Sequence, residues 1–96
     1  MQIRMTPEQM RTRSGEVSNQ QQAFQEVVSR MQNIINELQT EWEGQAANSF
    51  AQQFNDLQPS FRSMDELLGD ISMQLNQTAQ AVEELDNEIA SRFGVK

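Results

Sequence analysis

The chain has 96 residues, the size of one small domain, and its 14 acidic and 7 basic residues give it a net charge of −7. That charge disfavours a nucleic-acid partner and adsorption to anionic lipid, because both require clustered lysine and arginine. The chain has neither cysteine nor histidine, which excludes a disulfide framework, a thiol nucleophile, and the commonest metal ligand and general base.

The first predicted element is a helix over about residues 7–39. Thr6 at the N-cap, Pro7 at the first helical position and Gln9 two residues later form a capping box. Apolar residues then recur at alternating spacings of three and four, which is typical of a helix packed against other helices. The members of this stripe that we expect in a helix–helix seam are Phe24, Val28, Met31, Ile35 and Leu38.

The segment TEWEG, residues 40–44, is the only candidate for a turn and contains the single tryptophan. Two starts for the following helix remain open: Gly44 can cap it, or Thr40 can form a capping box with Glu43. Trp42 fills the last heptad position of the first helix. There it can close the core at the tip of a hairpin, take part in recognition, or do both.

The second predicted helix covers about residues 45–93. Pro59 removes one backbone hydrogen bond and usually bends the axis, but the heptad phase continues through it. We therefore expect one helix kinked near Pro59, ending at Gly94 after Phe93. Its expected seam residues are Phe50, Phe54, Leu57, Phe61 and Leu68.

The two helices differ in length by roughly 24 Å, so about sixteen residues of the second, from near Thr78, are expected to overhang the first. The overhang keeps its apolar stripe, and Val27 and Ile34 widen the stripe of the first helix. Both features predict a partner from outside the chain. The expected fold is an all-α antiparallel helix-turn-helix hairpin, a single domain over residues 1–96, that dimerises into an elongated four-helix bundle.

The triplet Trp42-Glu43-Gly44, placed between two heptad helices, resembles the WXG-motif family of small ESAT-like substrates of type VII secretion systems. The resemblance covers the whole chain. The family also carries a C-terminal export signal: an apolar or aromatic residue, an acid four residues later, and apolar residues three and then four further on. That spacing is matched by Val82, Asp86, Ile89 and Phe93, which an ideal helix places within an arc of about 60°. Many members have tyrosine where this chain has Val82.

The resemblance implies a homodimer, as is usual in Firmicutes. In it, the hairpin tip of one chain lies near the tail of the other, where the tail is the C-terminal segment that carries Val82, Asp86, Ile89 and Phe93. Trp42, Gly44 and the tail would then form one recognition surface for a membrane ATPase of the FtsK/SpoIIIE type. Secretion would start in the cytoplasm without a cleaved Sec signal, and the first residues, MQIRMTPE, lack the apolar region of such a peptide. The resemblance also allows a role as a virulence factor or as a co-export partner of larger proteins.

The tail also has a plainer interpretation. Its apolar residues are ordinary seam positions, and the acidic side chains around Asp86 can form a solvated face. Those acidic residues are Glu83, Glu84, Asp86 and Glu88. Negative charge near the C-terminal end of a helix is nevertheless unfavourable by a few tenths of a kcal/mol, which makes the cluster a place to look for function.

No catalytic constellation, cofactor motif or metal-binding pattern is expected. The alternative function is an intracellular adaptor that binds another helical protein through the same stripe. A membrane-active protein ranks last, because the polar faces lack the lysine and arginine of surface-seeking helices. No apolar run exceeds two residues, so stable membrane insertion is not expected.

Overall fold

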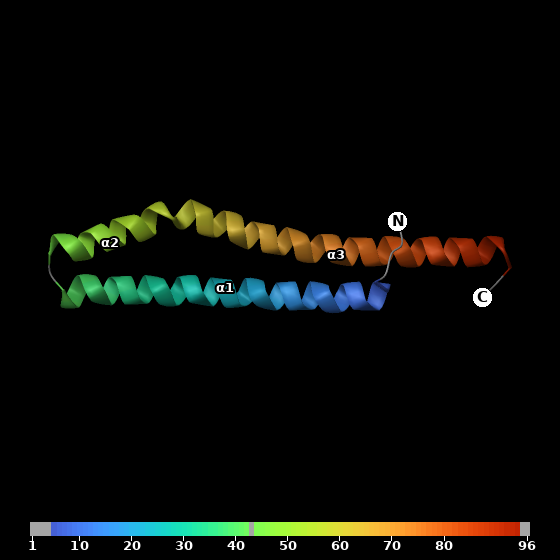
Figure 1. Ribbon diagram of the computed structural model, residues 1–96, viewed down its shortest axis with the longest axis horizontal. Helices are drawn as coiled ribbons and strands as arrows, with labels where there is room; N and C mark the ends of the chain where they lie inside the picture. The colour runs from blue at the N-terminus through green and yellow to red at the C-terminus, as the bar shows by residue number, and fades with distance from the viewer. Residues whose placement is uncertain (1–4, 43, 95–96) are drawn as a thin grey trace.

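The computed structural model describes residues 5–42 and 44–94, and these residues form an all-α hairpin (Figure 1). Helix α1, Pro7–Glu41, runs antiparallel to α2, Gln45–Asp56, and α3, Gln58–Arg92. The molecule is a rod of 75 × 17 × 17 Å. The predicted all-α hairpin is confirmed, and a rod this thin has only one layer of side chains between its two arms.

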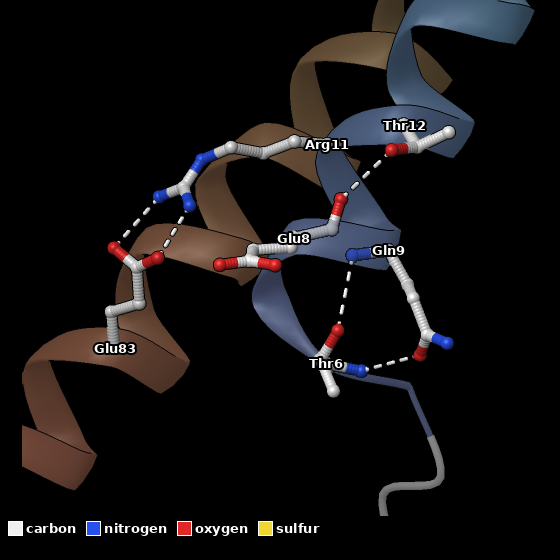
Figure 2. Close-up of polar contacts among 6 residues, drawn as sticks. All are labelled: Thr6, Glu8, Gln9, Arg11, Thr12 and Glu83. Carbon is white, nitrogen blue, oxygen red and sulfur yellow. Dashed lines mark hydrogen bonds and ion pairs between the residues drawn. The ribbon is translucent and has the colours of Figure 1, made fainter.

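Helix α1 begins with the predicted capping box (Figure 2). The Thr6 hydroxyl accepts the Gln9 N–H at 3.1 Å, and the Gln9 side-chain oxygen accepts the Thr6 N–H at 2.9 Å. Two backbone donors that no helical carbonyl can satisfy are therefore paired locally, with Pro7 between them. These contacts fix where the first arm starts.

The turn is shorter than the predicted residues 40–44, because α1 continues to Glu41. Thr40 lies in the last turn of α1, where its hydroxyl donates to the Asn36 carbonyl at 3.1 Å. Gly44 is the N-cap of α2, so the second arm starts at the glycine rather than at Thr40. Glu43, the other half of the alternative capping box, lies outside the described residues.

Helices α2 and α3 join through Leu57 alone, where the sequence predicts one kinked helix. The division falls two residues before Pro59, and the arm bends there (Figure 1). Leu57 keeps helical dihedral angles of −85° and −8°, its N–H donates to the Gln53 carbonyl at 3.2 Å, and its carbonyl accepts the Phe61 N–H at 3.0 Å. Pro59 lies in the first turn of α3, where a missing N–H is tolerated. The heptad phase consequently passes the break.

The two apolar heptad series of the second arm lie on different sides of it. One faces α1 and is buried or half-buried; it consists of Phe54, Phe61, Leu68, Leu75 and Val82. The other stays exposed in the single chain, with exposed fractions of 37–55%, and consists of Phe50, Leu57, Met64, Ile71 and Leu85. One pair of arms therefore uses only half of the apolar pattern.

This division separates the ten expected seam residues. Seven are buried or half-buried: Phe24, Val28, Ile35, Leu38, Phe54, Phe61 and Leu68. Three are exposed in the single chain: Met31, Phe50 and Leu57. At the centre of the seam the Phe61 ring meets Phe24 edge-on at 6.2 Å and Phe54 at 5.4 Å between ring centroids. These aromatic contacts provide the apolar packing nearest to the bend.

Polar side chains also take part in the seam between Phe24 and the free ends of the arms. Ser14, which is 2% exposed, donates to the Ser72 carbonyl at 2.7 Å, and the Ser72 hydroxyl donates to the Ser14 carbonyl at 3.1 Å. One heptad away, the Gln21 side-chain amide donates to the Asp65 carbonyl at 3.0 Å. Both contacts join polar groups of the two arms directly, so they fix the register between α1 and α3.

The overhang of α3 begins close to the predicted position near Thr78. The contact between Ser14 and Ser72 sets a register in which Pro7, the first residue of α1, lies level with Ala79, which is fully buried. Residues 80–92, roughly 20 Å of helix, therefore extend past the first residue of α1 (Figure 1). The long side chain of Arg11 reaches along α3 to form an ion pair with Glu83.

The serine pair leads to a first prediction. Ser14→Ala should lower the free energy of unfolding by about 1 kcal/mol, because a buried hydrogen bond between the arms is lost. Ser14→Ala combined with Ser72→Ala should cost at least about 0.5 kcal/mol less than the sum of the two single changes. Urea unfolding at one fixed protein concentration measures both quantities.

The control is Ser63→Ala, since the Ser63 hydroxyl donates only to the Pro59 carbonyl within its own helix. Its effect should stay within about 0.5 kcal/mol. Strictly additive serine substitutions would show that the two side chains do not act together.

Candidate functional site

The hairpin tip brings Trp42 and Phe50 together. Their ring centroids are 6.2 Å apart with planes inclined at 45°, so the indole packs beside the second turn of α2. Trp42 is nevertheless 50% exposed and caps α1 through a 2.8 Å bond from its N–H to the Leu38 carbonyl. The side chain thus closes the tip on one face and presents an aromatic surface on the other.

Gly44 gives the tip its direction. Its φ of 151° and ψ of 174° lie in a region essentially restricted to glycine. A Cβ placed there would meet no atom within 4 Å. The requirement for glycine is therefore a backbone requirement and not one of space.

The tail residues that match the export pattern differ in exposure. Val82 is half-buried, and Asp86 is exposed. Ile89 is 46% exposed and Phe93, the C-cap residue of α3, is 77% exposed. Gly94 follows with a φ of 68°, as predicted for the residue that stops the helix. The motif is thus half-buried at its first position and solvent-exposed at the other three.

Tip and tail are not brought together within one chain. They lie at opposite ends of the 75 Å rod (Figure 1). A surface that combines Trp42 with the tail motif therefore cannot form within one chain.

The charged side chains around the tail have different hydrogen-bond and ion-pair partners. Arg11 donates through two guanidinium nitrogens to the two oxygens of Glu83 (Figure 2), with one of the bonds at 2.8 Å. This hydrogen bonding lowers the pKa of Glu83, and the same contact raises the pKa of Arg11. Because the pKa of Glu83 is lowered on folding, the pair stabilises the hairpin at neutral pH and loses that contribution as the pH falls through the folded-state pKa.

The other acidic residues contact only their own helix. Glu88 accepts from Arg92 at 2.8 Å and Glu84 accepts from Gln80 at 3.2 Å. Among the described residues, Asp86 has no ion-pair partner. Its carboxylate is thus the acidic group of the tail that is open to another molecule.

Sequence reasoning did not predict the polar contacts between the arms. A signal was present: Ser14 and Gln21 occupy positions of an apolar heptad series, and Asp65 and Ser72 are also seven residues apart on the other arm. Two polar residues one heptad apart on each arm are what two matched cross-links require. The Arg11–Glu83 pair has no comparable signal, because it depends on side-chain reach.

Within residues 5–42 and 44–94, no three acidic side chains cluster in a way that would hold a metal ion. Within the same residues, no helix combines the length and the hydropathy that crossing a bilayer requires.

The family model for proteins of 100 residues with WXG, called WXG100, matches residues 2–87. The chain belongs to the WXG100 family. The matched range contains the tip residues Trp42 and Gly44 and the first two tail positions, Val82 and Asp86. It ends before Ile89 and Phe93.

Curated relatives match over nearly the full length. Protein YukE of Bacillus subtilis (strain 168) is 38% identical over 91 residues, which is 95% of this chain and 94% of YukE. Type VII secretion system extracellular protein A of Staphylococcus aureus (strain USA300) is 34% identical over 94 residues, covering 98% of this chain and 97% of the relative. The predicted membership of a type VII secretion family is confirmed by these matches.

Solved structures of WXG100-type proteins share the hairpin. EsxA of Geobacillus thermodenitrificans superposes with a TM-score of 0.85 at 33% identity, over 94% of this chain and 97% of that one. A point mutant of the secreted protein EsxB of Bacillus anthracis gives a TM-score of 0.74 at 26% identity, over 82% of this chain and 85% of that one. The arrangement of this hairpin is therefore that of the family.

The tip geometry yields a second prediction. Gly44→Ala should destabilise the protein by about 1–3 kcal/mol, because alanine is strained at that φ and ψ. Gly15→Ala is the matched control: Gly15 is an exposed residue inside α1, and a Cβ added to it would also have no atom within 4 Å. It should instead stabilise by about 0.5–1 kcal/mol.

Urea unfolding of the two variants beside the wild type measures this difference. Equal effects of the same sign would mean that the tip does not depend on the glycine backbone.

Proposed function

We propose that this chain is a small substrate of a type VII secretion system, exported as a folded homodimer and recognised through the C-terminal end of α3. The observation that carries the proposal is the exposed, helical continuation of α3 past α1, which displays Asp86, Ile89 and Phe93. Family membership and the name of the Staphylococcus aureus relative, a type VII secretion system extracellular protein, support it.

The exposed heptad series supports the dimer. Each arm of an antiparallel hairpin packs one stripe of its apolar residues against the other arm. The apolar residues beside that stripe on the two arms can then form one continuous surface. The exposed apolar residues at these positions form what we call the outer face: Val27, Met31, Ile34, Phe50, Leu57, Met64, Leu67 and Ile71. A second copy packed on this face would complete a four-helix bundle.

The dimer would also bring together what one chain holds apart. In an antiparallel pair of hairpins, the tail of each chain would lie near the tip of the other. Trp42, Gly44, Val82, Asp86 and Phe93 would then contribute to one surface. We propose that a membrane ATPase of the FtsK/SpoIIIE type reads this surface through its own basic and apolar groups.

The remaining parts of the proposal concern the route and the role of the protein. Synthesis in the cytoplasm would be followed by secretion without a cleaved Sec signal. The chain would act by binding and not by catalysis, with larger co-secreted proteins as further partners and a contribution to virulence as one consequence. No cofactor is needed for any of these steps.

A third prediction tests the dimer. Light scattering should give twice the chain mass of 11.0 kDa. Met64→Glu should yield single chains at the same concentration, because a carboxylate would be buried without a partner in the outer face. The control is Met73→Glu, which changes a methionine of similar exposure, 55% for Met73 against 44% for Met64. Met73 lies outside the outer face, because it is about 160° around the helix from Ile71, a member of that face.

The Met73 variant should stay dimeric. A monomeric wild type with full helicity, or an equal response of both variants, would contradict the proposed packing.

A fourth prediction tests export. In the host of the protein, the wild type should accumulate in the culture medium and Asp86→Ala should remain in the cell pellet. Glu88→Ala is the matched control, since Glu88 is an acidic residue of the same tail that pairs with Arg92 and lies outside the motif. Immunoblots of both fractions, with a cytosolic marker to exclude lysis, measure the distribution.

Equal export of the two variants would show that Asp86 is not part of the export signal. Retention of the wild type in the cell would instead favour an intracellular adaptor that binds a helical protein through the outer face.

A further inference from the structure

Among the described residues, the ion pair between Arg11 and Glu83 is the polar contact between the two arms that lies nearest to the tail. Both guanidinium nitrogens of the Arg11 fork engage the Glu83 carboxylate (Figure 2). Glu83 directly follows Val82, the half-buried first position of the tail motif. The pair therefore lies at the boundary between the packed part of α3 and its exposed end.

The geometry of the pair depends on the direction of the arms. The contact between Ser14 and Ser72 sets the register, which places Arg11 level with Leu75 and leaves Glu83 eight residues, roughly 12 Å, further along α3. Side chains lean toward the N-terminus of their own helix. In antiparallel arms, Arg11 thus leans toward the end of α3 and Glu83 leans back to meet it.

We propose that Arg11 is a positioning residue of the export signal: its bidentate contact with Glu83 fixes the base of the tail helix, so that Asp86, Ile89 and Phe93 face one direction. This inference rests on the proposed function for its consequence in export. The positioning itself is a property of the purified protein and is tested separately.

The tail needs such an anchor because little else holds it. Residues 84–92 lie past the first turn of α1, and three acidic groups there oppose the negative end of the helix. Helix ends without packing open readily, and a short helix is marginal in water. A contact at Glu83 acts where opening would otherwise enter the motif.

The first measurement is amide hydrogen exchange in the purified protein. Arg11→Gln should speed exchange over residues 84–92 by roughly two- to fivefold, the effect of losing one exposed bidentate pair. Exchange around Phe24 and Phe61 should not change. Arg13→Gln is the matched control, since it removes an equal charge two residues away but breaks only the local pair with Glu16.

The second measurement is export of the same variants. Arg11→Gln and Glu83→Gln should each reduce the fraction in the medium several-fold, while Arg13→Gln should not. The charge swap, Arg11→Glu combined with Glu83→Arg, should restore both tail protection and export. Restoration is not expected if Glu83 is itself read by the export machinery.

Each outcome decides a different claim. Unchanged exchange over the tail in Arg11→Gln overturns the positioning role, and so does export of that variant at the wild-type level. A swap that restores protection without restoring export also overturns it, and makes Glu83 a direct contact. If the wild type itself is retained, the proposed function fails, and hydrogen exchange alone decides whether Arg11 positions the tail.

Discussion

The packing of one helical arm against one other arm governs the rest of this structure. Two helices enclose a single line of side chains, so a rod 17 Å thick buries few residues completely. Phe54 and Ile35 are shielded where the arms meet, and most large apolar residues keep one side in water. A chain with this shape depends on contacts between its arms for register and on another surface for further burial.

The two halves of the seam are held together by different kinds of contact. Near the bend, Phe24, Phe54 and Phe61 supply apolar area that tolerates sliding, because such packing is not directional. Toward the free ends, hydrogen bonds from Ser14 and Gln21 require specific partners. The directional contacts thus set the register that the apolar contacts leave open.

The close approach of the arms has the same origin. Gly69 faces Gln21, and a Cβ on it would come within 3.1 Å of the Gln21 side-chain nitrogen. Ala79 is fully buried near the start of α1. The absence of a side chain at Gly69 leaves room for the Gln21 amide that donates to the Asp65 carbonyl.

Much of the fold could be predicted from local sequence, because its determinants are local. The capping box of Thr6 and Gln9 and the glycine at position 44 act within a few residues, and heptad spacing depends only on helical geometry. The position of one arm along the other, in contrast, is not determined by local sequence. The contact between Arg11 and Glu83 was not predicted, because it depends on the tilt and length of two side chains from distant parts of the sequence.

The candidate site was predictable to a similar extent. Spacing alone identifies a common arc for Val82, Asp86, Ile89 and Phe93, but not which of them α1 covers. Spacing also cannot separate the inward series from the outer face. Both series consist mainly of large apolar residues, so their composition does not show which one meets α1.

The apolar part of the tail is the seam itself, continued past the end of α1. Val82 and Ile89 belong to the same heptad series as Phe54 and Phe61, which α1 covers elsewhere. The tail thus presents to its surroundings the kind of surface that the rest of α3 buries within the chain. Under the proposed function, a receptor that packs on Ile89 and Phe93 would extend the contact that holds the hairpin together. The carboxylate of Asp86 at the edge of that surface would then favour a receptor with a basic group beside its apolar one.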